Sequence, residues 1–118
     1  MKRIALPAML ATFALVLPAS ANELTGTDLL SEISGNHYDC QMGDTPLEWI
    51  IAKVAAEATT VPYTAIVGGK TVNAEYALND KGRLTSDGYG EEREVVLLDI
   101  GTLRVARSDG RNMLCKVR

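Results

Sequence analysis

The first 21 residues have the pattern of a secretory signal peptide, which limits both the length of the folded chain and the compartment in which it folds. Two basic residues open the segment, residues 4–17 form an apolar run, and residues 19–21 (Ala-Ser-Ala) are the small residues that signal peptidase reads. A transmembrane span needs about 20 apolar residues, and this run is shorter and contains a proline. We therefore expect cleavage before Asn22 and export to the periplasm, or release from the cell.

Residues 22–118 are predicted to form one small secreted domain. Removing 21 of the 118 residues leaves 97, and the leader holds two of the 12 basic residues and none of the 15 acidic ones. The folded part is therefore acidic, and no linker, repeat or low-complexity stretch divides it. This composition argues against a two-domain enzyme, a disordered chain and a basic nucleic-acid binder.

Two cysteines, Cys40 and Cys115, remain in this domain. An even number of cysteines in an oxidising compartment predicts a disulfide, and two cysteines allow only one pairing within the chain. A redox pair usually has a Cys-x-x-Cys spacing, which is absent. We expect a structural bond that ties the first strand of the domain to its last strand.

The first half of the domain is predicted to contain two helices and one strand. A helix over residues 26–34 follows a capping pattern, and strict alternation predicts a strand over residues 37–42. Thr45-Pro46 resembles a helix start, and apolar residues then recur at helical spacing, which predicts an amphipathic helix over residues 46–58. The run Trp-Ile-Ile-Ala within it also fits a buried strand.

The second half has the pattern of an antiparallel meander. A hairpin is expected around Gly68-Gly69 and another around Asp109-Gly110. The strands are expected over residues 64–67, 70–78, 83–86, 92–99, 102–107 and 111–117. The predicted fold class is α+β: a short N-terminal helix and one amphipathic helix packed on a curled antiparallel sheet or small partial barrel, with one disulfide.

Candidates for catalysis or metal binding are scarce. His37 is the only histidine, and with both cysteines paired it leaves zinc without a ligand set. His37 and Asp39 share a strand face, a spacing that lets a carboxylate orient an imidazole, but no serine has a nucleophile-elbow context. Glu91 and Glu92 could chelate calcium but lack EF-hand spacing, so a solvated acidic face is expected. We predict no catalytic residue, metal or cofactor.

Two surface segments are candidates for binding. The loop Ser86, Asp87, Gly88 and Tyr89 is expected to expose its tyrosine, whereas Trp49 is expected in the core. A basic face is expected on the C-terminal hairpin, formed by Arg104, Arg107 and Arg111. Such a face suits an anionic surface, and it also serves to protect an edge strand from aggregation.

Short motifs resemble two groups of secreted proteins. The segments Leu-Thr-Gly-Thr-Asp-Leu-Leu (24–30), Ser-Gly-Asn (34–36), Tyr-x-x-Asn-x-x-Gly (76–82), Gly-Thr-Leu-Arg-Val (101–105) and Leu-Cys (114–115) resemble small secreted bacterial proteins of unknown function. Tyr38-Asp39-Cys40 with the late Cys115 is similar to periplasmic inhibitors of C-type lysozyme. The second resemblance implies a small eight-stranded barrel with a disulfide. The inhibitory Ser-Gly-x-x-Tyr loop of those inhibitors differs in order from residues 86–89.

Three functions are compatible with these features. The favoured one is a non-enzymatic periplasmic or secreted binding or inhibitor module of unknown ligand, and a basic protein such as a lysozyme is one candidate partner. The first alternative is a cell-envelope structural or stress protein that contacts anionic surfaces through its arginine hairpin. The second is a small hydrolase that uses His37. Partners are expected to be proteins or envelope components rather than nucleic acid.

Overall fold

The computed structural model describes residues 22–86 and 91–118, which form nine strands and one α-helix. The elements are β1 (Glu23–Leu24), α1 (Gly26–Ile33), β2 (His37–Met42), β3 (Thr45–Ile51), β4 (Thr60–Val67), β5 (Lys70–Leu78), β6 (Leu84–Ser86), β7 (Glu92–Asp99), β8 (Thr102–Arg107) and β9 (Asn112–Val117). Within these residues, none of the helical structure is long and apolar enough to cross a membrane.

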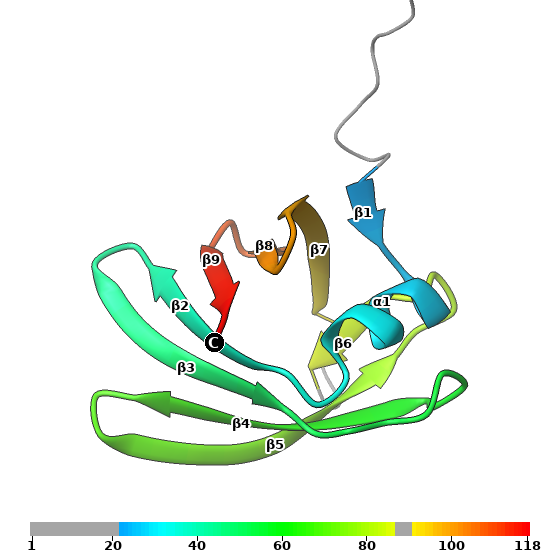
Figure 1. Ribbon diagram of the computed structural model, residues 1–118, viewed down its shortest axis with the longest axis horizontal. Coiled ribbons are helices and arrows are strands. Elements are labelled where there is room, and N and C mark those ends of the chain that lie inside the picture. The colour runs from blue at the N-terminus through cyan, green and yellow to red at the C-terminus, as the bar shows by residue number, and fades with distance from the viewer. Residues whose placement is uncertain (1–21, 87–90) are drawn as a thin grey trace, which may run out of the picture.

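Strands β2 to β9 form a closed antiparallel barrel of eight strands (Figure 1). Each strand pairs with the next one along the chain, and β9 pairs back with β2. The short strand β1 pairs with β7 beyond the end of β6. The prediction of an α+β fold with two helices is therefore wrong, because the sheet closes on itself and the described residues contain a single α-helix, which covers one end of it.

The predicted second helix over residues 46–58 is instead strand β3 followed by a connection to β4. Tertiary pairing outweighs the local helix pattern, because β3 is bonded to β2 on one side and to β4 on the other. Alternation buries Trp49 and Ile51 inside the barrel. Pro46 lies near the start of the strand, where a missing N–H is tolerated. The apolar residues Val54 and Ala58 pack against the core from the connection.

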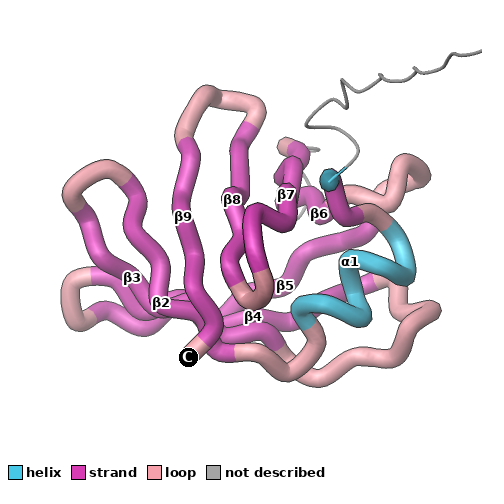
Figure 2. Tube along the Cα trace, turned by 45° about the horizontal axis from the view of Figure 1, so that its top comes forward, coloured by secondary structure: helices cyan, strands magenta, loops and turns pink. Residues whose placement is uncertain are grey.

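Helix α1 has nearly the predicted bounds, and it covers one end of the barrel. Its apolar stripe is fully buried and consists of Leu29, Leu30 and Ile33. The hydroxyl of Ser34, directly after α1, donates to the carbonyl of Val54 and accepts from its N–H, which ties the helix to the β3–β4 connection. Figure 2 shows α1 on the opposite side of the barrel from the β2–β3 and β4–β5 turns. The helix therefore fills one end of the barrel and leaves the other end to the strands.

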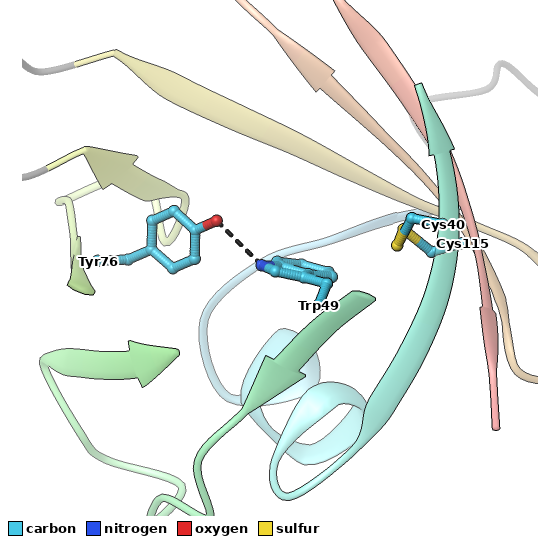
Figure 3. Close-up of a disulfide and its surroundings, with 4 residues drawn as sticks. All are labelled: Cys40, Trp49, Tyr76 and Cys115. Carbon is cyan, nitrogen blue, oxygen red and sulfur yellow. Dashed lines mark hydrogen bonds between the residues drawn. A yellow bond between two sulfur atoms is a disulfide. The ribbon is translucent and has the colours of Figure 1, made fainter. Parts of the chain in front are cut away.

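The predicted disulfide between Cys40 and Cys115 is confirmed. The two residues lie directly opposite each other on β2 and β9, the strand pair that joins the two ends of the meander. Both cysteines are buried on the inner face of the barrel, close to Trp49 (Figure 3). The bond therefore fixes the closure of the barrel by a covalent link.

Removing this link is expected to lower the stability of the barrel strongly. The bond closes a loop with a sequence separation of 75 residues, for which the chain-entropy model gives about 4 kcal/mol. We expect the double variant Cys40→Ala/Cys115→Ala to lose about that much free energy of unfolding in urea titrations. The wild-type chain kept reduced by dithiothreitol is the control and should lose a similar amount; an unchanged midpoint in both would contradict the role of the bond.

A cluster of charges on the outer face holds β1 against the barrel. The Arg83 guanidinium donates to both carboxylate oxygens of Glu23, at 2.7 and 3.0 Å, and to Glu92 at 2.9 Å. The Asn79 side chain also donates to Glu92. Hydrogen bonds from Arg83, and then from Asn79, hold the pKa of Glu92 below its ordinary value. Arg83 therefore links the N-terminal strand β1 to β7.

The contribution of Arg83 is expected to depend on pH. The pKa of Glu92 is lower in the folded chain than in the unfolded chain, where it is about 4. The Arg83–Glu92 contact therefore stabilises the fold fully above the unfolded-state pKa, and this stabilisation is lost as the pH falls through the folded-state pKa. Arg83→Gln should therefore be less stable than wild type near neutral pH, and the gap should narrow in acid. Lys81→Gln, which removes an exposed partner 3.5 Å from Glu92, is the control and should change little. A gap of constant size in unfolding titrations across this range would argue against the mechanism.

Candidate functional site

The open end of the barrel contains a cavity of about 160 Å³, which we call the barrel mouth. Met42, Val67 and Arg107 are the last residues of β2, β4 and β8, so the mouth lies at the end where these strands turn back. The lining consists of Met42, Leu47, Trp49, Tyr63, Ala65, Val67, Tyr76, Arg93, Val105, Arg107 and Met113. Apart from the two arginines the wall is apolar or aromatic, which is the usual character of a ligand pocket.

Three aromatic side chains form the floor of the barrel mouth. The rings of Tyr63 and Tyr76 are stacked with their centroids 4.1 Å apart, and Trp49 meets Tyr76 edge-on at 6.2 Å. The indole N–H of Trp49 donates to the Tyr76 hydroxyl at 3.0 Å (Figure 3). Burial raises the pKa of Tyr76, so its hydroxyl stays protonated at neutral pH. These contacts hold the floor rigid and satisfy its buried polar groups.

Arg93 reaches the barrel mouth from β7 with a side chain that is only 9% exposed. Its guanidinium donates to the Ser86 hydroxyl at 2.7 Å and to the Glu91 carbonyl at 3.0 Å. It also lies over the ring of Tyr76, 5.5 Å from the centroid, a cation–π contact. These contacts fix the position of a buried positive charge beside the aromatic floor.

Arg107 reaches the same cavity from the end of β8. Its Nη2 atom lies 2.9 Å from a carboxylate oxygen of Glu91 and 3.4 Å from one of Asp109. Its Nε atom is buried and has no hydrogen-bond partner among the described residues. A buried donor without an acceptor is costly, and such groups are rare in folded proteins.

Three carboxylates of the acidic segment have arginine partners in the structure. Glu91 is paired with Arg93 and Arg107, and Glu92 and Glu94 lie within ion-pair distance of Arg83. Glu92 and Glu94 belong to the outer face of β7, opposite to the inward Arg93. These three carboxylates of the expected solvated acidic face are therefore engaged in ion pairs.

The structure brings Arg107 and Arg111 of the predicted basic face to the same carboxylate, Asp109, but places Arg104 apart from them. Arg107 lines the barrel mouth, whereas Arg104 alternates to the outer face of β8. Arg111 lies in the connection before β9, with a side chain that is 64% exposed and 3.5 Å from Asp109. In the predicted binding loop, Ser86 ends β6 and accepts from Arg93, while Asp87, Gly88 and Tyr89 lie outside the described residues.

His37 lies on the outer face of the barrel, away from the mouth. Its Nε2 atom is 2.8 Å from a carboxylate oxygen of Glu48 on β3, rather than bonded to Asp39. Asp39 accepts from Arg118, and that hydrogen bond lowers its pKa. In the segments 22–86 and 91–118, no three histidine, cysteine or acidic side chains gather as a metal site would require.

Sequence reasoning missed Tyr63, Tyr76 and Arg93 as members of a site. The alternation of β7 carries a usable signal, because Arg93 shares the inward face with Val95 and Leu97. An arginine in the apolar register of a strand must meet either buried partners or a ligand. The alternation within β7 does not predict which strands lie opposite it. That β7 faces the aromatic residues of β3, β4 and β5 becomes evident only in the closed barrel.

The hydrogen bond across the floor of the mouth is expected to stabilise the barrel. Tyr76→Phe removes the acceptor of the buried Trp49 N–H, so we expect a loss of about 1–3 kcal/mol in the free energy of unfolding. Tyr63→Phe keeps this acceptor and is the matched control, with a smaller expected loss. Chemical denaturation followed by Trp49 fluorescence measures both variants, and equal losses would contradict the assignment.

No family model, curated protein or solved structure matches the chain in the comparisons with known proteins. The function must therefore be inferred from the geometry and chemistry of the barrel mouth.

Proposed function

We propose that the chain is a non-enzymatic binding module that holds a compact apolar group in the barrel mouth. The observation that carries this proposal is the cavity of about 160 Å³ inside the closed barrel, with an aromatic floor and apolar walls. Apolar cavities of about 150 Å³ are large enough to bind benzene. The occupant is thus a small molecule, or the apolar end of one, of about the size of a single ring.

The disulfide supports a site of action outside the cytoplasm. Structural disulfides persist in oxidising compartments, and the leader pattern of residues 1–21 points to the same compartment. The module is therefore proposed to act in the periplasm or outside the cell.

The other functions considered from the sequence have less support. Capture of a basic protein is not favoured at Glu91, Glu92 and Glu94, because these carboxylates already have arginine partners. Contact with an anionic surface needs arginines on one face, but Arg104 and Arg107 point to opposite faces of β8. His37 does not support the hydrolase alternative. Its Nε2 atom contacts the carboxylate of Glu48 on the outer face of the barrel.

Binding should be measurable through Trp49, the only tryptophan of the chain. A single ring buries on the order of 150 Å², and at about 25 cal/mol per Å² this corresponds to about 4 kcal/mol, or a Kd of about 1 mM. We expect toluene and cyclohexanol to cause a saturable change in Trp49 fluorescence in this concentration range.

Two phenylalanine substitutions distinguish binding in the cavity from binding elsewhere on the surface. Ala65 lines the mouth, so Ala65→Phe is expected to fill the cavity and abolish the saturable change. Ala77 is exposed on β5, so Ala77→Phe is the matched control and should leave binding as in wild type. Circular dichroism checks that both variants fold. Absence of binding in wild type, or equal binding by folded Ala65→Phe, would refute the proposal.

A further inference from the structure

We infer that the compact apolar group held in the barrel mouth is a side chain of an extended peptide, whose backbone adds a strand to the open edge of β5. This inference rests on the proposed function and names the molecule that carries the apolar group. Two independent observations carry it: the ring-sized cavity of the mouth, and a strand edge beside it that has no partner among the described residues. Binding by strand addition takes its affinity from main-chain hydrogen bonds and its specificity from pockets for alternate side chains.

The mouth half of β5 has a strand partner on one side only. Strand β4 pairs with β5 from Lys70 to Ala77, whereas β6 pairs with it only from Tyr76 to Leu78. All the residues from Lys70 to Glu75 are exposed. Figure 1 shows the β4–β5 hairpin projecting beyond the short strand β6. Among the described residues, no strand therefore pairs with this half of β5 on the side of β6.

The connection after β6 is too short to fill this edge. The Ser86 N–H donates to the Glu91 carbonyl at 3.1 Å, next to the pairing of Ser86 with Tyr76. Four residues join Ser86 to Glu91, and a segment that leaves and returns within four residues extends at most about 7 Å, at about 3.4 Å per residue. On the same scale, Asn73 lies about 10 Å and Thr71 about 17 Å along β5 from Tyr76. The edge at these two residues is therefore open to a partner.

The backbone groups of Thr71 and Asn73 point to this open side. A residue of an antiparallel strand directs its N–H and C=O to the same side, and successive residues alternate between the two sides. Ala77 pairs with Thr85 of β6, and its carbonyl accepts from the Thr85 hydroxyl, so Thr71 and Asn73 share the side of β6. An added antiparallel strand can form about four hydrogen bonds with these two residues. The open edge contains no proline and no bulge, the features that commonly block strand addition.

The open edge lies beside the barrel mouth. Val72 pairs with Ala65, and Ala65 pairs with Trp49, so the three residues form one row across the inner face of the sheet. Ala65 and Trp49 line the mouth. Val72 shares the inward register of the buried Tyr76, yet it is 50% exposed. A residue of an added strand opposite Val72 extends this row, and its side chain points to the inner side of the sheet. An apolar ring at this position covers Val72 and enters the mouth.

The sequence of the edge favours a peptide over a second copy of this chain. Antiparallel pairing of two β5 edges would place Lys70, Val72 or Ala74 opposite Val72, because only inward residues can face one another. Lys70 is charged, and Val72 and Ala74 are smaller than the ring that the mouth accommodates. The open edge has one lysine at its start and one glutamate, Glu75, at its end, so an uncharged peptide suits it.

Pentapeptides with a central phenylalanine test the inference on the wild-type chain. Acetyl-Thr-Thr-Phe-Thr-Thr-amide should change Trp49 fluorescence and bind at least about tenfold more tightly than toluene, because main-chain hydrogen bonds add to the burial of the same ring. With the phenylalanine opposite Val72, the N–H groups of its two neighbours face β5 and its own N–H faces away. N-methylation of both neighbours should abolish the gain in affinity. N-methylation of the phenylalanine is the matched control and should keep it.

Two substitutions of Thr71 test the same contact from the side of the protein. Thr71→Pro removes an N–H that faces the open edge, a position at which strands tolerate proline. This variant should lose the gain in peptide affinity and bind toluene as wild type does. Thr71→Val keeps the N–H and is the control, which should bind both compounds as wild type does. If circular dichroism shows that Thr71→Pro does not fold, the N-methylated peptides decide the question with the wild-type chain.

The outcomes separate this inference from the function on which it rests. Toluene binding without tighter binding of the peptide, or equal affinities of the two N-methylated peptides, overturns strand addition and leaves the binding module intact. Analytical ultracentrifugation of the chain without peptide tests the other occupant. A wild-type dimer that Thr71→Pro abolishes would assign the edge to a second copy and would also overturn the inference. If toluene fails to bind, the proposed function itself fails.

Discussion

The structure depends on the pairing of β2 with β9, which turns a meander of strands into a closed barrel. The Cys40–Cys115 bond lies within this pair and makes the closure covalent. Closure gives each of the strands β2 to β9 a neighbour on both sides and defines an inside, where Tyr38, Trp49 and Leu103 are fully buried. A small chain has few large side chains with which to fill such a space. The interior is therefore packed at one end and partly empty at the other.

The two ends of the barrel are filled by different means. At the end covered by α1, aliphatic side chains of the helix complete the core. At the other end, the inward positions of β4 include Ala65, which is small, and β7 and β8 contribute Arg93 and Arg107. Burying a guanidinium is unfavourable unless it is paired, and Glu91, Ser86 and Asp109 supply partners to these two arginines. The hollow end thus combines unfilled apolar space with two paired arginines, and we place the ligand site there because of the apolar space.

Much of the strand pattern was predictable, because alternation and glycine turns are local signals. The bounds of β2, β7 and β8 match the expectation, and so does the pairing of the two cysteines. The expected helix over 46–58 failed because Thr45-Pro46 and the apolar spacing are local cues, whereas β3 is held by strands on both sides. The candidate site could not be predicted for a related reason. Residues of β3, β5 and β7 come together only when the barrel closes, and no local sequence pattern predicts that closure.

The most direct test of the account is a nuclear magnetic resonance titration of the nitrogen-15-labelled chain with toluene. The account predicts that the indole N–H signal of Trp49 and the backbone N–H signals of Ala65 and Val105 shift along one saturation curve, because these residues line the same cavity. The Nε signal of Arg104, on the outer face of the same strand, should stay in place. Shifts confined to Arg104 or to residues around His37, with the signals of Trp49, Ala65 and Val105 unmoved, would contradict a ligand site inside the barrel mouth.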